Sequence, residues 1–366
     1  MRHSGQRERK EQGNSVVEQI RKNFSSDNVV PACPAVMSAL AAANADAAPA
    51  YGGDAWTARL DDVVADIFEH PVKVFPVATG TAANALALAA LAPPYAAILC
   101  DESAHIAQSE CAAPDFFTGG ARLVTIPSED GRMTPEALSY KLGRLPADDV
   151  HNPLPTALSL TQATEWGTVY PPAHIAELTA RARSRNLAVH MDGARLANAI
   201  AHLGCSPAEA TWKAGIDVLS LGMTKNGAMA AEAVVFFNPA HAEQFARRRK
   251  RSGHDWSKQR FLSAQILACL EDDLWLNNAR HANAMAQRLA GGLFRHPGSR
   301  MLYETQANEI FVLLPDRAIA HLRAAGFAFH DWDTPEGVDG TVIRLVTSYY
   351  TRIEDVDALL ETLSEI

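Results

Sequence analysis

The sequence predicts an α/β protein with a large domain built on a mostly parallel sheet, followed by a small C-terminal α+β domain. Three observations support this prediction. From Val72 onward, short apolar or β-branched runs alternate with longer helical stretches, which is the pattern of βαβ units. Near residue 300 the pattern changes to short strands with few helices, which is typical of a small antiparallel sheet. The chain has 366 residues, more than the roughly 250 to 300 that one hydrophobic core usually supports.

The individual elements follow from these runs. We expect strands of the large domain at residues 73–77, 97–100, 121–126, 156–160, 187–191, 218–221 and 233–237. The expected helices are 81–92, 134–143, 172–186 and a long stretch over 242–289, broken near Ser252 and Gly253. In the small domain we expect strands at 301–304, 309–313, 328–332 and 342–346, and helices at 317–325 and 353–366. The expected domains are therefore residues 23–275 and 276–366, preceded by a polar extension at residues 1–22.

Composition excludes several classes of protein. The chain is 48% hydrophobic and 20% charged, and no apolar run approaches the ~20 residues of a membrane span. A net charge of -9 argues against a nucleic-acid surface, so we interpret the basic run at residues 247–251 as the solvated face of a helix. The five cysteines are scattered and lack the spacing of metal ligands. We predict a cytoplasmic protein without a metal site, a nucleic-acid partner or a membrane anchor.

An acid and a lysine are the most informative residues. Asp192 and Lys225 each follow an apolar, strand-like run, so both are expected at the carboxyl edge of the sheet, where α/β proteins bind ligands. A lysine that forms a Schiff base and an acid that keeps a ring nitrogen protonated match the needs of pyridoxal 5′-phosphate. Two alternatives remain open: Asp192 and Arg195 also fit an ordinary ion pair in a loop, and Lys225 also fits a surface lysine.

Two further segments fall at the same edge. Gly80 and Thr81 join a strand to an apolar helix, and the free N–H groups and dipole of a helix N-terminus favour a phosphate. They also fit a turn glycine and a helix cap. His105 follows the next strand and is placed either to stack on a planar ligand and transfer protons or to be hydrogen-bonded in a loop. Glu110 either orients this site or is solvated. The order of phosphate turn, histidine, acid and lysine is far more specific than any member alone.

Together these motifs resemble the threonine aldolase family of fold-type-I pyridoxal-phosphate enzymes, within the group of β-eliminating lyases. The resemblance is closest to the low-specificity L-threonine aldolase and phenylserine aldolase branch, and it runs from about residue 23 to the C-terminus. It is carried by Ser25-Ser26-Asp27-Asn28, Tyr51-Gly52-Gly53-Asp54, Gly80-Thr81, His105, Asp192-Gly193-Ala194-Arg195, Thr224-Lys225 and Ile343-Arg344-Leu345-Val346-Thr347-Ser348.

The resemblance implies a role for each matching residue. Lys225 forms the Schiff base, Asp192 binds the pyridine nitrogen and His105 stacks on the ring. The remaining contacts to cofactor and substrate fall into three groups: Gly80, Thr81 and Thr224 for the phosphate; Ser26, Arg195 and Arg344 for the substrate carboxylate, with Arg195 also beside Asp192; and Tyr51, Lys258 or Arg260 reaching into a neighbouring subunit. Residues shared between subunits imply a homo-oligomer, either a dimer or a homotetramer.

One segment departs from the family. Many members carry a histidine in Glu-Asn-Thr-His, where this chain has Gln162-Ala163-Thr164-Glu165, so Glu165 occupies the histidine's position. The expected activity is retro-aldol cleavage of L-β-hydroxy-α-amino acids (threonine, allo-threonine and phenylserine) to glycine and an aldehyde. The general base is left open among Glu165, His105 and a water. The alternatives are another enzyme of this fold, namely a β-eliminating lyase or an aminotransferase, and a non-catalytic cofactor-binding regulator.

Overall fold

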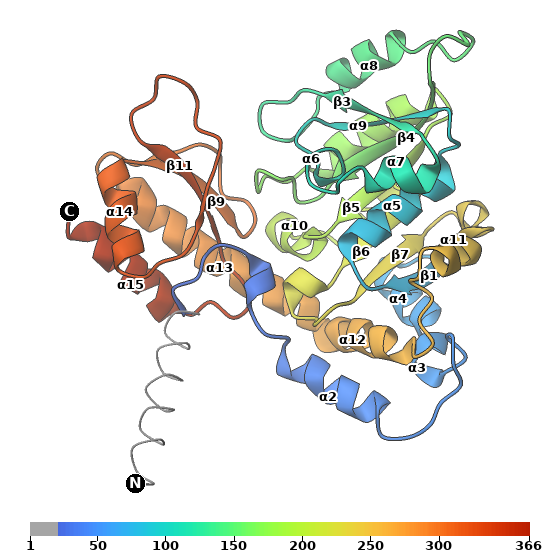
Figure 1. Ribbon diagram of the computed structural model, residues 1–366, viewed down its shortest axis with the longest axis horizontal. Coiled ribbons are helices and arrows are strands. Elements are labelled where there is room, and N and C mark those ends of the chain that lie inside the picture. The colour runs from blue at the N-terminus through green and yellow to red at the C-terminus, as the bar shows by residue number, and fades with distance from the viewer. Residues whose placement is uncertain (1–20) are drawn as a thin grey trace. The chain divides into compact units, whose positions relative to one another are not determined.

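The computed structural model describes residues 21–366, which form two compact units (Figure 1). The large unit comprises residues 32–277, and the C-terminal unit combines residues 21–31 with 278–366. Residues 23–31 therefore belong to the C-terminal unit rather than the large domain. The reason is backbone pairing: the Phe24 N–H donates to Ala328 O at 2.8 Å, and Phe24 O accepts the Val346 N–H at 2.8 Å. The extension expected at residues 1–22 lies, except for its last two residues, outside the described residues.

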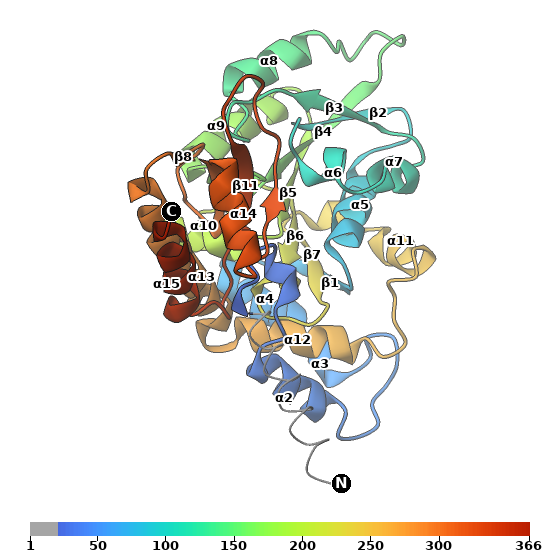
Figure 2. The same ribbon diagram turned by 60° about the vertical axis from the view of Figure 1, so that its left-hand side comes forward.

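The large unit contains a seven-stranded sheet in the order β1-β7-β6-β5-β4-β2-β3. Strand β7 is antiparallel to its neighbours β1 and β6, and all other pairs are parallel. In Figure 2 the labels β5, β6, β7 and β1 follow one another in this order. The prediction of a mostly parallel α/β sheet is confirmed. The strands are β1 Lys73–Val77, β2 Ala96–Asp101, β3 Arg122–Ile126, β4 Leu154–Thr161, β5 Ala188–Gly193, β6 Val218–Gly222 and β7 Glu232–Phe236.

Helices surround this sheet. They are α2 Pro34–Ala43, α3 Ala55–Ala58, α4 Leu60–Phe68, α5 Gly80–Leu91, α6 His105–Gln108, α7 Ala113–Thr118, α8 Pro135–Gly143, α9 Pro172–Arg183, α10 Leu196–Leu203, α11 Phe245–Arg251 and α12 Arg260–Leu270, with short 3-10 turns at η2 Trp212–Ala214, η3 Thr224–Asn226, η4 Pro239–Ala242 and η5 Glu271–Asp273. The long helix expected over 242–289 breaks at the predicted Gly253, where φ is 81°, and again at Asp272, where φ is 51°. The second break was not predicted, because no glycine or proline marks it.

Helix α5 lies at the centre of the large unit. It contacts strands β1, β4, β5, β6 and β7 and is buried along nearly its whole length. Its leucines Leu86 and Leu88 share a core cluster with Val218 and Phe236 of the sheet. The helix begins where β1 ends, because the Thr79 hydroxyl caps it by accepting the Ala82 N–H at 3.2 Å. Its N-terminus therefore opens at the carboxyl edge of the sheet.

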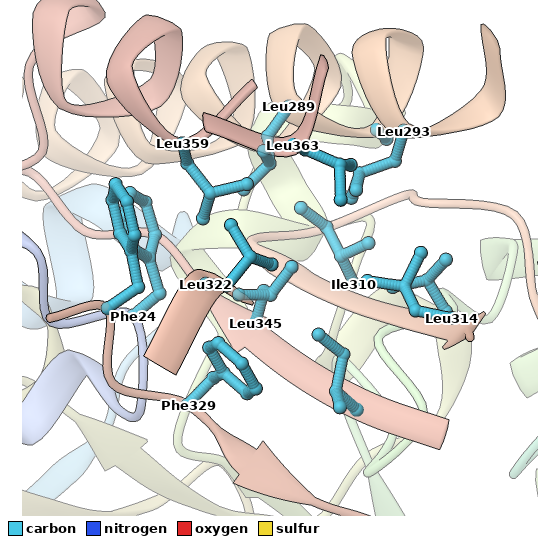
Figure 3. Packing of buried hydrophobic residues seen from close by; sticks show 14 of the residues in the cluster. Phe24, Leu289, Leu293, Ile310, Leu314, Leu322, Phe329, Leu345, Leu359 and Leu363 are labelled. Atoms are coloured by element: carbon cyan, nitrogen blue, oxygen red, sulfur yellow. The ribbon is translucent and has the colours of Figure 1, made fainter. Parts of the chain in front are cut away.

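The C-terminal unit has a four-stranded antiparallel sheet in the order β10-β11-β9-β8. Three helices cover one face of it: Leu289 and Leu293, Leu322, and Leu359 and Leu363 pack on alternate strand residues such as Ile310 and Leu345 (Figure 3). Arg344, between two inward residues, lies on the other face. The elements are η1 Asp27–Val29, α13 Leu274–Arg295, β8 Arg300–Met301, β9 Glu309–Leu314, α14 Asp316–Ala324, β10 His330–Asp331, β11 Thr341–Val346 and α15 Ile353–Ser364. Within residues 21–366, no helix has the length and apolar character needed to cross a membrane.

Candidate active site at the sheet edge

Asp192 and Lys225 lie at the carboxyl ends of neighbouring strands. Asp192 is the penultimate residue of β5, opposite Ser220 of β6, and Lys225 lies in η3 just beyond the end of β6. The two chain segments are in close contact, because a Cβ atom on Gly222 would lie 2.6 Å from the Cα atom of Ala194. Only glycine permits this approach. The structure thus brings the two residues to adjacent positions at the sheet edge, as their places after apolar runs indicated.

A hydrogen-bonded network that includes Asn84, Glu110 and His105 holds the carboxylate of Asp192. Asp192 is 4% exposed; its Oδ1 accepts the Ala194 N–H at 3.0 Å and its Oδ2 accepts an amide N–H of Asn84 at 2.8 Å. The Asn84 amide nitrogen also donates to Glu110 Oε1 at 2.8 Å. That oxygen lies 2.9 Å from Nδ1 of His105. The Asn84 nitrogen therefore donates to both carboxylates and bridges them, which offsets part of their mutual repulsion.

The same contacts set the charge of His105. The hydrogen bond that the His105 ring donates to Glu110 raises the pKa of His105. Burial opposes this, and the negative charges of Glu165 and Asp192 add to the increase. Burial raises the pKa of Glu110, while its hydrogen bonds with His105 and Asn84 lower it. Protonated His105 and ionised Glu110 therefore stabilise each other. Glu110 is buried and orients the histidine, which decides the alternative left open for Glu110 in favour of orientation.

Glu165 reaches the same region from the segment after β4. Its charge acts on His105, so the two side chains lie within electrostatic range at this edge. The side chain is half-buried, between the buried Thr164 and the half-buried Trp166. The structure thus places Glu165 near His105.

The N-terminus of α5 provides space for an anion. A Cβ atom on Gly80 would meet nothing within 4 Å, and the first N–H groups of an α-helix have no partner inside the helix. Thr81 is half-exposed beside it. On the far side of β7, the Thr224 hydroxyl accepts the Ala231 N–H at 3.2 Å. Both turns adjoin the first residue of β7, Glu232, which pairs with Val77 of β1 and Gly222 of β6.

The residues expected at the substrate carboxylate lie in both units. Arg195 is buried in the large unit at the start of α10. In the C-terminal unit, Arg344 Nη2 donates to Ser25 O at 3.3 Å, which places the arginine beside Ser26. Arg344 also lies 3.9 Å from a carboxylate oxygen of the buried Glu309, and its Nε is buried without a hydrogen bond. Arg344 and Ser26 thus form one cluster with unused hydrogen-bonding capacity.

The residues expected to act across subunits separate into two groups. Tyr51 is 55% exposed, its N–H donates to Ser257 O at 3.0 Å, and Lys258 is exposed next to that serine. Arg260 is buried instead, and its Nε donates to Ala43 O at 2.9 Å, at the end of α2. Tyr51 and Lys258 are accessible from one surface, whereas Arg260 holds α2 against α12 within its own chain.

Two polar residues at this edge had no predicted role. Asn84 lies inside the apolar helix α5, and Glu232 opens the apolar strand β7. The only signal in the sequence was a single polar residue in an otherwise apolar element. Such a residue needs a buried partner, but the pattern does not say which.

The sequence pattern of the family described as beta-eliminating lyase matches residues 23–315. The chain belongs to this family. It is 44% identical to the low specificity L-threonine aldolase of Pseudomonas aeruginosa, over 92% of this chain and 96% of that one. The corresponding enzyme of Pseudomonas sp. is 43% identical over 86% and 94%. Among solved structures, the threonine aldolase of Leishmania major superposes with a TM-score of 0.88 at 26% identity, over 94% of this chain and 98% of that one. The resemblance and the fold class expected from the sequence are confirmed.

Proposed function

We propose that this protein is a pyridoxal 5′-phosphate-dependent aldolase that cleaves L-β-hydroxy-α-amino acids to glycine and an aldehyde. One observation carries the proposal. Lys225, the buried carboxylate of Asp192 and the open N-terminus of α5 converge on one sheet edge in a chain whose relatives are low specificity L-threonine aldolases. Cleavage of the Cα–Cβ bond makes the protein a carbon–carbon lyase.

The residues at the edge fit the cofactor. Lys225 offers an amine, Asp192 offers a buried carboxylate for the ring nitrogen, and Gly80, Thr81 and Thr224 border the space for the phosphate. The buried Oδ1 of Asn84 has no hydrogen-bond partner, so the site retains polar capacity beside Asp192. When bound, the cofactor supplies a conjugated ring that accepts the electron pair of the breaking bond.

The remaining residues orient the substrate and move its proton. Ser26, Arg195 and Arg344 bind the carboxylate, which fixes the direction of the Cα–Cβ bond. The raised pKa of His105 favours its protonated form, which has no free ring nitrogen to accept a further proton. Glu165 therefore accepts the proton of the substrate hydroxyl, directly or through a water. The aldehyde leaves, and Cα takes up a proton to give glycine.

We also propose a cytoplasmic homo-oligomer, a dimer or tetramer. The exposed Tyr51 and Lys258, which share one surface, support a contribution to the active site of a neighbouring subunit. None of the five cysteines forms a disulfide, which supports a reducing compartment.

Product analysis tests the proposed activity. Purified holoenzyme is incubated with L-threonine, L-allo-threonine, L-phenylserine and their D-forms, and aldehyde, glycine, ammonia and keto acid are quantified. The proposal predicts equal amounts of aldehyde and glycine from the L-forms. Ammonia with a keto acid would instead assign β-elimination, and an amino-group transfer to an added keto acid would assign an aminotransferase. Binding of cofactor without any turnover would support a regulator.

A further inference from the structure

Glu232 is a buried carboxyl group that the proposed function does not use. As the first residue of β7 it lies between Val77 of β1 and Gly222 of β6. Strand β1 leads into the turn that opens α5, and β6 leads into the turn that carries Lys225. A single carboxyl group is thus enclosed between the phosphate turn and the lysine turn.

The hydrogen bonds of Glu232 go to the residues just before Lys225. The Met223 N–H donates to Glu232 Oε2 at 2.7 Å, and both the hydroxyl and the backbone of Thr224 bond to the same carboxyl group. The 3-10 turn η3 has three residues, and the Asn226 and Ala228 N–H groups both donate to Met223 O at 3.0 Å. Outside partners add to these few bonds: Glu232 on the side before Lys225, and a bond from Asn226 to Trp275 O at 2.7 Å on the side after it.

This arrangement has a cost in stability. Burial raises the pKa of Glu232 to about 7, against the opposing effect of its hydrogen bonds and of the Lys225 charge. The titratable groups that act on it are Lys225 of η3 and, from α12, Cys269. A residue selected only for packing at the start of an apolar strand would be uncharged, since a buried carboxylate is expensive. The carboxyl group of Glu232 costs stability and contacts the turn that carries Lys225. This combination points to a functional role for Glu232.

We propose that Glu232 is a positioning residue for Lys225. Its hydrogen bonds with Met223 and Thr224 hold the turn in the conformation that presents the Lys225 amine, and its carboxyl group lies within electrostatic range of that side chain. The inference rests on the proposed use of pyridoxal phosphate. It extends that function by assigning the group that sets the geometry and charge of the cofactor-binding lysine.

The variants Glu232→Gln and Glu232→Ala test the proposal, with Asp217→Asn as a matched control. Asp217 also holds a backbone N–H, that of Val189 at 2.8 Å, but at the opposite end of β5 and β6. Cofactor affinity is measured by titrating apoprotein with pyridoxal phosphate, and the visible absorbance of the loaded protein is followed against pH. For Glu232→Gln we expect about tenfold weaker binding, and an absorbance transition whose midpoint moves to lower pH by about one unit. Asp217→Asn should leave both unchanged.

Three results would overturn the assignment. The first is a Glu232→Gln protein with wild-type affinity and an unshifted absorbance midpoint. The second is an equal loss of affinity in Asp217→Asn, because a general loss of sheet stability would then explain it. The third is weaker binding by Glu232→Gln with no change in the midpoint, since the proposed charge effect would be absent. If Glu232→Ala does not fold, Glu232→Gln alone decides. Wild-type protein that binds no pyridoxal phosphate would refute the proposed function instead, so the two failures are distinguishable.

Discussion

The buried carboxyl of Glu232 predicts an unusual dependence of stability on pH. In the folded apoprotein its pKa is about 7, and in the unfolded chain it is the ordinary 4.5. Between these pH values the folded protein binds more protons than the unfolded chain, so the free energy of unfolding falls as pH rises from about 4.5 to 7. The stabilising contribution of protonated Glu232 is fully present below pH 4.5 and lost above pH 7. The difference between the two pKa values corresponds to roughly 3 kcal/mol.

Glu232→Gln removes this dependence because glutamine does not titrate. As pH rises from 5 to 8, the free energy of unfolding of the variant should therefore increase relative to that of the wild type by up to roughly 3 kcal/mol. A constant loss of about 1 kcal/mol at every pH, from the weaker hydrogen bond to Met223, is superimposed on this gain. The test is therefore how the difference in unfolding free energy between variant and wild type changes with pH. Its value at a single pH is not informative. Thermal unfolding of both apoproteins at several pH values from 5 to 8 measures it. A difference in Tm between the two proteins that stays constant over this range would contradict a raised pKa for Glu232.

Three further predictions concern the network around Asp192. Glu110→Gln removes the main cause of the raised pKa of His105, so that pKa should fall, and an NMR titration of the His105 ring checks this. Replacing the exposed Glu177 by Gln serves as the control. A fall in the pKa of His105 in Glu177→Gln as well would show that the hydrogen bond with Glu110 is not the cause. Asn84→Ala leaves two buried carboxylates without their shared donor and should lower the free energy of unfolding by about 2 kcal/mol, measured with urea; full stability would show that water replaces the amide. Glu165→Gln should lower kcat by about a hundredfold, with little change in KM and an unaltered cofactor spectrum. Glu165→His, which introduces the residue that many family members carry, should retain most activity. Unchanged turnover in Glu165→Gln would show that Glu165 is not the base.

The strands could be predicted from sequence because most are short apolar runs that are buried in the sheet, although β3 is largely exposed or half-buried. Their positions as observed differ from the expected ones by no more than a few residues at either end. The direction of β7 could not be predicted in the same way, since an apolar run looks alike whether its neighbours are parallel or antiparallel. The place of residues 23–31 also escaped prediction. It depends on the bonds of Phe24 with Ala328 and Val346, which are far away in sequence.

The residues of the candidate site also divide into those that the sequence predicted and those that depend on tertiary contacts. The positions of Asp192, Lys225 and Gly80 were predictable because residues at or just beyond the carboxyl ends of parallel strands must meet at one edge. Asn84 and Glu232 were not, because each lies within an apolar element and acquires its role only from its tertiary partners. Glu110 was recognised near the site, but its hydrogen bonds with His105 and Asn84 depend on how α5 and α6 pack. Chemistry that depends on chain order can be read from the sequence, whereas the partners of single buried polar residues cannot.

The central claim is that Lys225 is the residue that binds the cofactor at this sheet edge. The most direct measurement is borohydride reduction of the holoenzyme, followed by proteolysis and mass mapping of the pyridoxyl group. We expect one modified lysine, Lys225, and loss of the label when L-threonine is added before the reductant, because the substrate amine displaces the lysine. A label on another lysine, or Lys225→Ala protein that retains the label and normal turnover, would contradict it.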